Sequence, residues 1–238
     1  MHHLFVMCVD ALFTENLSDV RQLPGFARVL QNAAIFEHVD CVYPTLTYVC
    51  HASIMSGCWP DRHGVPHNQI LDPAIEDRNW YWDYSHMRVP TVFDYARHAG
   101  LSTASVGWPV TAGAPNIDVN IPEVWEPDES VWGDPERLAR RLDAIYERGC
   151  SPYGFELYER HRGLLQNNAT PQLDEFDTAC NEDIICELRP DVHFTHQAAL
   201  DHARHEHGVL APEVQDALRA HDGWICRCID AMKEAGTY

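Results

Sequence analysis

The chain has 238 residues, of which 45% are hydrophobic and 10% aromatic, so it is long enough to bury a core as one large domain or two small ones. This composition excludes the disordered, collagen-like and coiled-coil classes. Acidic residues outnumber basic ones by 36 to 17, and the formal net charge of −19 repels a phosphate backbone, which argues against a nucleic-acid polymer as partner.

The first quarter of the chain alternates strand and helix patterns. A continuous apolar run, LFVMCV, is typical of a strand covered on both faces. Ile35, Val39 and Cys41 fall on one side of an alternating run, which predicts a second strand. Gly57 is a typical stop after a helix. The elements expected here are a strand at 4–9, a helix at 23–30, a strand at 34–42 and a helix at 47–56.

The remainder of the chain continues this alternation. Asp134-Pro135 and Thr170-Pro171 each pair a capping residue with a proline, as at the start of a helix. Strands that alternate with helices predict a mostly parallel sheet flanked by helices. We expect the polar, proline-dotted stretches 69–87 and 111–170 to be insertions over one edge of this sheet. The elements expected here are a helix ending at Gly100, a strand at 103–108, helices opening at 134–135 and 170–171, a strand at 191–197 and a helix at 212–235.

Cysteine usage and the start of the chain bear on the cellular compartment. The nine cysteines are scattered and include no CxxC pair, which excludes a zinc ribbon and a thioredoxin-type pair. Their odd number argues against a disulfide framework, so we expect reduced thiols in a cytoplasmic protein. The apolar run at 4–9 is too short to cross a membrane and lacks the features of a signal peptide, so we expect no membrane contact.

Polar residues follow several of the expected strands, at the edge where ligands gather in open α/β sheets. Asp10 directly follows the first strand, Thr47 begins the helix after the second, and Asp201 and His205 follow the strand at 191–197. A hydroxyl in the first turn of a helix lies near unpaired backbone N–H groups and the positive end of the dipole, which favours phosphate binding. Each residue also has a structural interpretation, as a turn aspartate, a capping threonine or part of a solvated histidine-rich loop. Thr45, two residues before Thr47, is a competing candidate for the reactive hydroxyl.

Four further features fit the same chemistry. The spacing Asp201-x-x-x-His205 lets both side chains reach one ion. Asn68 could donate its side-chain amide to an oxyanion, or be an ordinary loop residue. Trp80 and Trp108 are candidates for a wall around a leaving group, although a core position for Trp108 fits its place at a strand end equally well.

Three blocks of the sequence together resemble the type I phosphodiesterase/nucleotide pyrophosphatase branch of the alkaline phosphatase superfamily. The most specific block, 44–68, contains PTLT, GCWPDRHG and a following asparagine, which resemble the family's P-T-x-T block, its G-x-x-P-x-x-H-G turn and its asparagine. The string VDAL at 9–12 resembles V-D-G-L, with Ala11 where glycine is usual. The string DHARHEHG at 201–208 resembles D-x-x-G-H-x-x-G, with Arg204 in place of the glycine.

The resemblance implies a three-layer α/β fold of the alkaline phosphatase type and a hydrolase that uses two Zn²⁺ ions. Its substrates would be small esters with phosphodiester or pyrophosphate bonds, cleaved through a phospho-threonine intermediate. Asp10 and Thr47 would hold one ion, with Thr47 as the nucleophile, and Asp201 and His205 would hold the other. Asn68 would steady the phosphoryl oxygens. Two dications clamp the attacking and leaving oxygens and overcome the repulsion between a −19 chain and an anionic substrate.

Some features of the family do not occur at their expected places. The family's D-H-G pair and a C-terminal histidine ligand do not occur there, so we expect residues 1–238 to be an incomplete catalytic domain that is missing its C-terminal part and can be inactive alone. A related phosphomonoesterase, phosphonate hydrolase or phosphomutase stays open, whereas a sulfatase is disfavoured because no Cys/Ser-x-Pro-x-Arg block surrounds Thr47. A noncatalytic metal-binding protein is the alternative of another class. The sequence predicts no oligomeric state.

Overall fold

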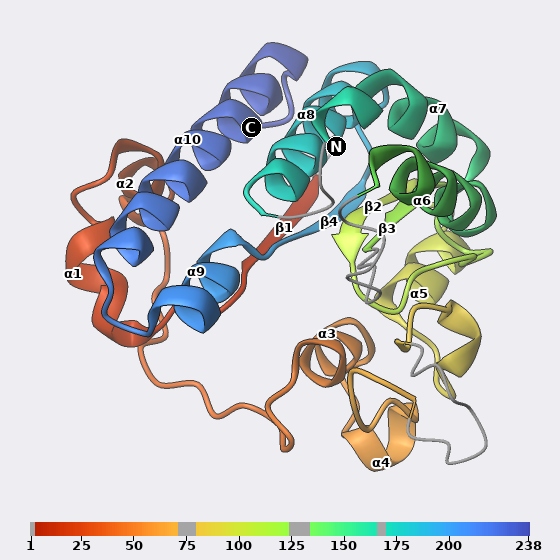
Figure 1. The fold of residues 1–238 in the computed structure, drawn as a ribbon, viewed down its shortest axis with the longest axis horizontal. Helices are drawn as coiled ribbons and strands as arrows, with labels where there is room; N and C mark the ends of the chain where they lie inside the picture. Colours follow the sequence, from red (N-terminus) through yellow and green to blue (C-terminus); the bar gives the residue numbers. More distant parts are fainter. Residues whose placement is uncertain (1–2, 71–79, 124–133, 166–169) are drawn as a thin grey trace.

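The computed structural model describes residues 3–70, 80–123, 134–165 and 170–238 (Figure 1). Within these residues, parallel strands form one sheet in the order β1-β4-β2-β3. Because the strands run in the same direction, their carboxyl ends meet at one edge of the sheet. The strands are β1 (Leu4–Val9), β2 (Thr103–Trp108), β3 (Val119–Pro122) and β4 (Val192–Gln197).

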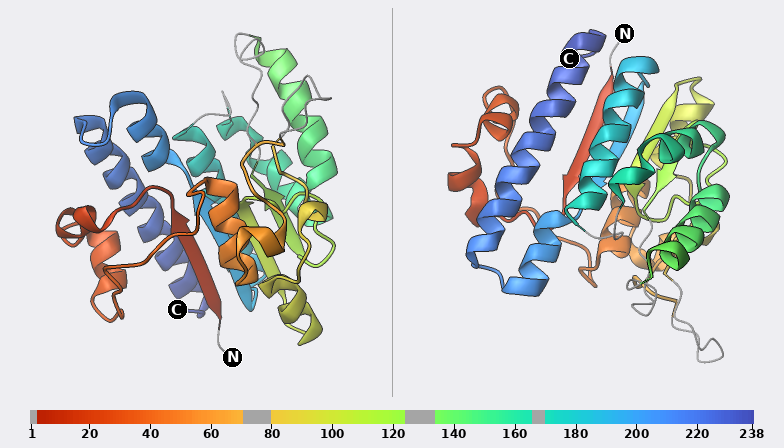
Figure 2. Two further views of the ribbon diagram at one scale, coloured as in Figure 1. Left: turned by 90° about the horizontal axis from the view of Figure 1, so that it is seen from below. Right: turned by 45° about the horizontal axis from the view of Figure 1, so that its top comes forward.

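Helices cover both faces of this sheet (Figure 2). On one face lie α6 (Pro135–Gly149), α7 (Pro152–His161), α8 (Gln172–Glu187) and α10 (Pro212–Ala235). On the other face lie α3 (Thr47–Ser56), α4 (Pro60–His63) and α5 (Val92–His98). The described residues also form the helices α1 (Leu17–Val20), α2 (Pro24–Leu30) and α9 (Ala199–His207) and 3₁₀ turns at Thr14–Asn16, Tyr84–His86 and Arg162–Leu164. The predicted three-layer α/β fold is confirmed.

The alternation of side chains along β4 separates the two apolar cores. Phe194 faces the layer of α3 and α5, where its ring packs against Phe93 at a centroid distance of 5.2 Å. The next residue, Thr195, faces α8 and accepts a hydrogen bond from Asn181 Nδ2 at 2.9 Å. Successive residues of a strand point to opposite faces, so the apolar run of β1 packs Val6 and Cys8 against one core and Met7 and Val9 against the other. Because β1 is an edge strand of the described sheet, these side chains are only half-buried.

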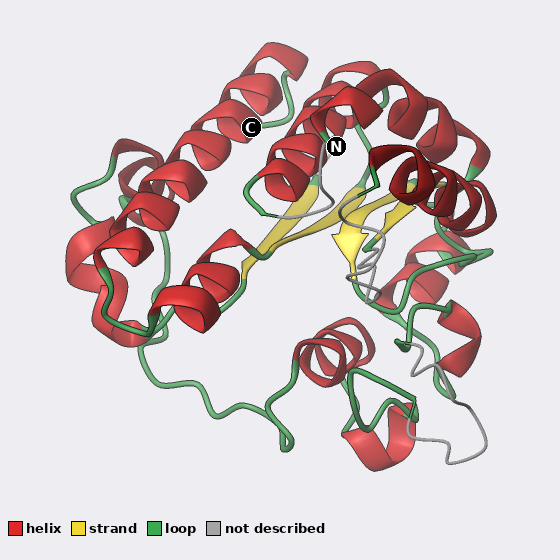
Figure 3. Cartoon of the chain, in the orientation of Figure 1, coloured by secondary structure: helices red, strands yellow, loops and turns green. Residues whose placement is uncertain are grey.

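Local patterns predicted most element boundaries correctly, with one clear exception. The segment 34–42, predicted as a strand, is irregular and exposed, and Figure 3 draws it as a loop. Phe36 and Val39 are 82% and 78% exposed. A strand is stable only beside a neighbour that completes its hydrogen bonds, and no described residue pairs with this segment. Its alternating pattern was therefore not sufficient, and the prediction is wrong for this structure.

The stretch 111–170 is not simply an insertion over the edge of the sheet, as the sequence suggested. It contributes β3, which pairs with β2, and the helices α6 and α7, which cover β3. Its parts 124–133 and 166–169 lie outside the described residues, as does 71–79 of the other expected insertion, 69–87. In the described part of that insertion, Trp82 is buried in the core between α3, α5 and the sheet.

Two observations bear on the expected compartment. Among the described residues, no helix has both the length and the apolar sequence needed to cross a bilayer. All nine cysteines are free thiols, and the sulfur atoms of Cys41 and Cys50 lie 3.2 Å apart. A cytoplasmic location stays a prediction.

Candidate active site

A cavity of about 210 Å³ opens at the carboxyl ends of β1 and β4, beside the first turns of α3 and α9. Six of the seven residues predicted to form a site line it together, although they come from well-separated parts of the chain. Its lining residues are Asp10, Thr47, Asn68, Trp80, Glu123, Thr170, Leu173, His196, Ala198, Asp201, His202 and His205.

Asp10 lies where β1 ends, and the backbone holds it firmly. Its N–H donates to the carbonyl of Gln197 at 2.9 Å, which extends the β1–β4 pairing by one residue. Its Oδ1 accepts from the N–H of Ala11 at 2.9 Å. Ala11 has a φ of +56°, a left-handed conformation that is costly for residues other than glycine. This turn directs the Asp10 carboxylate into the cavity instead of letting β1 continue.

Thr47 is the first residue of α3, and its hydroxyl contacts Asp10. Thr47 Oγ1 donates to Asp10 Oδ2 at 3.2 Å. Leu46, in an extended conformation with ψ 148°, begins the helix without a side-chain cap. The Thr47 hydroxyl therefore lies at the helix terminus where unpaired N–H groups and the positive end of the dipole meet.

Asn68 lines the cavity beside the first turn of α3. Its Oδ1 accepts a hydrogen bond from the N–H of Tyr48 at 3.0 Å, so the following loop is tied to the start of α3. Because Oδ1 is the acceptor, the NH₂ group is the part of the amide that can donate to a ligand. The loop is held further by the carbonyl of Asn68, which accepts from the N–H of Tyr81 at 2.9 Å.

Asp201 and His205 lie one helical turn apart on α9. Asp201 Oδ2 and His205 Nε2 are 3.4 Å apart, and the two side chains are 33% and 78% exposed. Burial and the negative charge of Asp10 raise the pKa of Asp201. The segment expected as a possible solvated loop is thus a helix, and its two candidate ligands face Asp10 across the cavity.

The two tryptophans predicted as a wall for the leaving group differ in position. Trp80 lines the cavity, and its ring packs against Tyr48 at 5.2 Å. Trp108 is fully buried and packs against the rings of His51 at 4.7 Å and Phe194 at 4.9 Å. Trp108 therefore lies in the core, the alternative that the sequence left open for it, and is not among the residues that line the cavity.

Two residues that the sequence patterns did not indicate, His196 and Glu123, also line the cavity. His196 Nε2 lies 3.3 Å from Asp10 Oδ2, and its Nδ1 lies 3.6 Å from Glu123 Oε1. His196 is the penultimate residue of β4, which pairs with β1, so its place near a strand end was the available signal. It was missed because it lies within a buried strand, where a histidine is an ordinary core residue.

Asp10, His196 and His51 shift one another's pKa values. Burial raises the pKa of Asp10, but the hydrogen bond and charge of His196 and the charge of His51 outweigh it and hold the pKa below its usual range. Burial lowers the pKa of His196, but Asp10 and Glu123 outweigh this effect and raise it to about 9. His51, whose ring meets that of His196 edge to face at a centroid distance of 4.3 Å, has a pKa lowered to about 3 by burial and by the charge of His196.

The donor atoms around the cavity fit Zn²⁺ chemically. Carboxylate oxygens and imidazole nitrogens are typical zinc ligands, and Glu123 Oε2 is buried without a hydrogen-bond partner. Among the described residues, however, no three His, Cys, Asp or Glu side chains are arranged to hold one ion. The side chains thus present pairs of donors, Asp10 with His196 and Asp201 with His205.

Comparison with known proteins identifies the family. The profile of type I phosphodiesterase / nucleotide pyrophosphatase matches residues 4–238. The chain belongs to this family. It is 24% identical over 223 residues to human ectonucleotide pyrophosphatase/phosphodiesterase family member 1, which covers 89% of this chain and 19% of that protein. It is 32% identical over 79 residues to venom phosphodiesterase 2 of Crotalus adamanteus, covering 31% of this chain and 10% of that protein.

Solved structures show the same fold. Murine ectonucleotide pyrophosphatase/phosphodiesterase 5, as an inactive variant in complex with AMP, superposes with a TM-score of 0.63 at 15% identity, covering 100% of this chain and 54% of that one. Phosphonoacetate hydrolase from Sinorhizobium meliloti, in complex with phosphonoformate, gives 0.63 at 18% identity, covering 97% and 54%. The present chain thus spans about half the length of these solved chains and about a fifth of the length of the human relative.

Proposed function

We propose that this family member hydrolyses phosphodiester or pyrophosphate bonds of small esters, with Thr47 as the nucleophile and two Zn²⁺ ions as cofactors. The observation that carries the proposal is the contact of 3.2 Å between Thr47 Oγ1, at the start of α3, and Asp10 Oδ2, at the end of β1. A hydroxyl at the positive end of a helix dipole, with its proton directed to a carboxylate, is suited to attack a phosphoryl group.

The chemistry proceeds in two displacements on phosphorus. Thr47 Oγ1 forms a bond to phosphorus while the bond to the leaving-group oxygen breaks, and that oxygen departs with the electron pair. Asp10 accepts the hydrogen bond of the hydroxyl, so a lone pair of Oγ1 faces the cavity. Asp10 takes the hydroxyl proton as Oγ1 attacks, and the departing oxygen takes a proton from solvent. Water then attacks the phospho-threonine, its oxygen stays on phosphorus and one of its protons passes to solvent. The bond between phosphorus and Oγ1 breaks with its electron pair on Oγ1, which takes the first proton back from Asp10.

The remaining residues position the phosphoryl group and its cofactors. The NH₂ group of Asn68 donates to a phosphoryl oxygen, since its Oδ1 is occupied by the N–H of Tyr48. Zn²⁺ held by Asp10 with Thr47, and by Asp201 with His205, would lower the pKa of the Thr47 hydroxyl and offset the charge of the phosphoryl group. Imidazole and carboxylate donors on both sides of the cavity support this assignment.

The cavity suits a small ester. Its volume of about 210 Å³ accepts a phosphoryl group and part of a leaving group, and Trp80 offers an aromatic surface at its wall. The two similar solved structures hold AMP and phosphonoformate, respectively. A small ester as the ligand of this cavity is consistent with both of these complexes. The net charge of −19 argues against a nucleic-acid polymer.

A phosphonate hydrolase is the second candidate, favoured by the likeness to phosphonoacetate hydrolase in fold. The same nucleophile and donors would serve a phosphomonoesterase or a phosphomutase. A noncatalytic metal-binding protein would keep Asp201 and His205 as ligands but would show no dependence of any turnover on Thr47. The cytoplasmic location is part of this proposal and is tested by fractionation of cells that express the protein.

A substrate screen tests the function. The purified protein is assayed with bis-p-nitrophenyl phosphate, p-nitrophenyl phosphate, a dinucleotide and phosphonoacetate, before and after a chelator. We expect diester cleavage that the chelator abolishes and Zn²⁺ restores. Thr47→Ala should lower the rate by about 10³-fold or more, whereas Thr45→Ala, which removes the neighbouring hydroxyl, should retain activity. Preference for phosphonoacetate would favour the second candidate, and full activity of Thr47→Ala would remove Thr47 as the nucleophile.

A further inference from the structure

Two cysteines, one on each side of Thr47 in the sequence, bring their sulfur atoms together. Cys41 Sγ lies 3.2 Å from Cys50 Sγ, and this is the only hydrogen bond between two cysteines among the described residues. Cys41 is exposed in the irregular segment before α3, whereas Cys50 is half-buried and is the fourth residue of α3. Neither is among the residues that line the cavity, so the proposed hydrolysis leaves both thiols without a role.

The two sulfur atoms are close enough to be bonded after a small movement. The sulfur atoms of a disulfide are about 2.05 Å apart, so these two must approach each other by about 1.2 Å. Cys50 is fixed by its helix, because its N–H donates to the carbonyl of Leu46 at 2.9 Å. Cys41 lies in the segment 34–42, which is irregular and pairs with no described strand. The movement therefore falls to Cys41, and α3 is retained.

The two thiols differ in their access to a reagent. Cys41 is exposed, and an accessible thiol is the one that a reagent in solution reaches first. Burial, together with the hydrogen bond and charge of Cys41, raises the pKa of Cys50 to about 12, which makes Cys50 the poorer initial nucleophile. The part of this rise that Cys41 causes disappears once the Cys41 sulfur is bonded to another sulfur, because it then carries neither a proton nor a charge. Cys50 is thus suited to react second.

We propose that Cys41 and Cys50 are a modification site, at which a small disulfide such as glutathione disulfide oxidises the two thiols to a reversible disulfide. The thiolate of Cys41 attacks one sulfur of the oxidant, whose S–S bond breaks and releases a first thiolate. The thiolate of Cys50 then attacks the Cys41 sulfur of this mixed disulfide and releases a second thiolate. Each cysteine gives one proton to solvent and each released thiolate takes one up, so two protein thiols are oxidised while one small disulfide is reduced to two thiols.

The disulfide changes the segment that leads into α3. It closes a ring of ten residues, 41–50, that contains both Thr45 and Thr47. Closing a ring removes conformational freedom from the chain that it encloses, so oxidation ties the irregular segment to α3. The inference does not depend on the proposed function, because it concerns thiols that the hydrolysis does not use.

Three single variants separate the roles of the two thiols. After treatment with glutathione disulfide, Cys50→Ser should trap the mixed disulfide, with one glutathionyl group on Cys41. Cys41→Ser should keep Cys50 as a thiol, because the half-buried sulfur is not the first to react. Cys58→Ser, beyond the other end of α3, is the matched control and should form the same disulfide as the wild type. Glutathionylation of Cys50 in Cys41→Ser, with Cys41 unmodified in Cys50→Ser, would overturn the step in which Cys41 attacks first.

The unfolded chain shows whether the fold selects this pair. When the same oxidation is carried out in urea, the nine cysteines are free to pair with one another, and we expect a mixture of crosslinks. A single Cys41–Cys50 crosslink from the native protein and a mixture from the unfolded chain would support the inference. The same mixture from both would overturn it, because the contact of 3.2 Å would then not select the pair.

Alkylation and peptide mapping provide the measurement. The reduced native protein is incubated with glutathione disulfide, quenched in acid, unfolded, alkylated with excess reagent and digested with chymotrypsin, which cuts after Tyr48, between the two cysteines. We expect the number of alkylated cysteines to fall from nine to seven and one crosslinked pair of peptides, Cys41 with Cys50, that dithiothreitol separates. Nine alkylated cysteines, a glutathionyl group that stays on Cys41, or a crosslink to another cysteine or another chain would overturn the inference.

Discussion

Thr47 Oγ1 lies 3.2 Å from Asp10 Oδ2 although 37 positions separate the two residues along the chain. The contact exists because β1 ends at a left-handed turn at Ala11 and α3 begins at Thr47 on the same edge of the sheet. Asp201 and His205 reach that edge from β4, which pairs with β1. The parallel sheet is thus what assembles the candidate site.

The first prediction concerns the ion assigned to α9. Asp201→Asn and His205→Ala should each lower the zinc content by about one ion per chain, because each removes a donor from the pair that spans one helical turn. The measurement is elemental analysis after dialysis against Zn²⁺. His207→Ala, on the same helix but outside the cavity, is the matched control and should bind the wild-type amount. Unchanged zinc in both Asp201→Asn and His205→Ala would contradict the assignment.

The second prediction concerns the turn after β1. Ala11 has a φ of +56°, and this conformation costs a residue with a Cβ about 1–2 kcal/mol. Ala11→Gly removes that cost but increases the entropy of the unfolded chain by about 0.4–1 kcal/mol. The free energy of unfolding should therefore rise by about 0.5–1 kcal/mol, as measured by urea denaturation.

A helical alanine provides the control for this substitution. Ala27 lies inside α2, where glycine should lower the free energy of unfolding by about 0.5–1 kcal/mol. Opposite signs for Ala11→Gly and Ala27→Gly are expected. A loss of stability at both positions would mean that the turn at Ala11 carries no strain.

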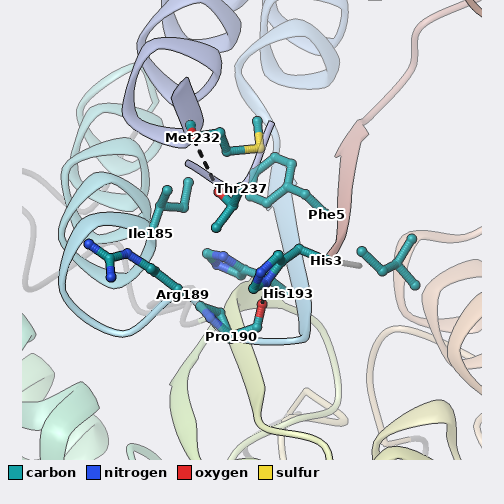
Figure 4. Close-up of a pocket in the computed structure, with 9 residues that line it drawn as sticks. His3, Phe5, Ile185, Arg189, Pro190, His193, Met232 and Thr237 are labelled. Carbon is teal, nitrogen blue, oxygen red and sulfur yellow. Dashed lines mark hydrogen bonds between the residues drawn. The ribbon is translucent and has the colours of Figure 1, made fainter. Parts of the chain in front are cut away.

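The third prediction concerns His193, at the opposite end of β4 from the cavity. Figure 4 shows its ring beside His3 and Phe5 in a small pocket of about 20 Å³. Both of its ring nitrogens are buried without a hydrogen-bond partner, and burial lowers its pKa to about 3. The unfolded chain, with a histidine pKa of about 6.5, binds one more proton between these values. The free energy of unfolding therefore falls as the pH decreases from about 6.5 to about 3.

His193→Phe should remove this contribution. The stability difference between variant and wild type should grow in favour of the variant as the pH falls, by at most about 1.4 kcal/mol per pH unit. Urea denaturation at pH 7, 6, 5 and 4 measures it, and groups common to both proteins cancel in the difference. A difference that does not change with pH would show that His193 does not titrate as its burial implies.

Most of the fold could be predicted because local patterns specify it. The apolar run of β1, the helix that ends at Gly57 and the long amphipathic α10 each carry their signal within their own residues. The segment 34–42 could not be judged this way, because its alternation is compatible with a strand only where a neighbour exists. The four-residue strand β3 lies in a polar stretch and is too short to carry a pattern.

The candidate site was predictable only in part, for a similar reason. Asp10, Thr47 and Asp201 follow strands or begin helices, so the topology of a parallel sheet brings them to one edge. His196 lies inside a buried strand and Glu123 directly after another, and only the three-dimensional structure shows that both face the cavity. For Trp108 the sequence left a site position and a core position open, and only the three-dimensional structure shows that its side chain is buried in the core.

The most direct test of the central proposal is the detection of a covalent intermediate. The purified protein, loaded with Zn²⁺ and mixed with a phosphodiester, is quenched in acid within the first turnover, digested and examined by mass spectrometry. We predict phosphorylation of Thr47 in the peptide that spans α3, and its loss in Thr47→Ala. Turnover without a modified Thr47, or with the phosphoryl group on Thr45 instead, would contradict the account.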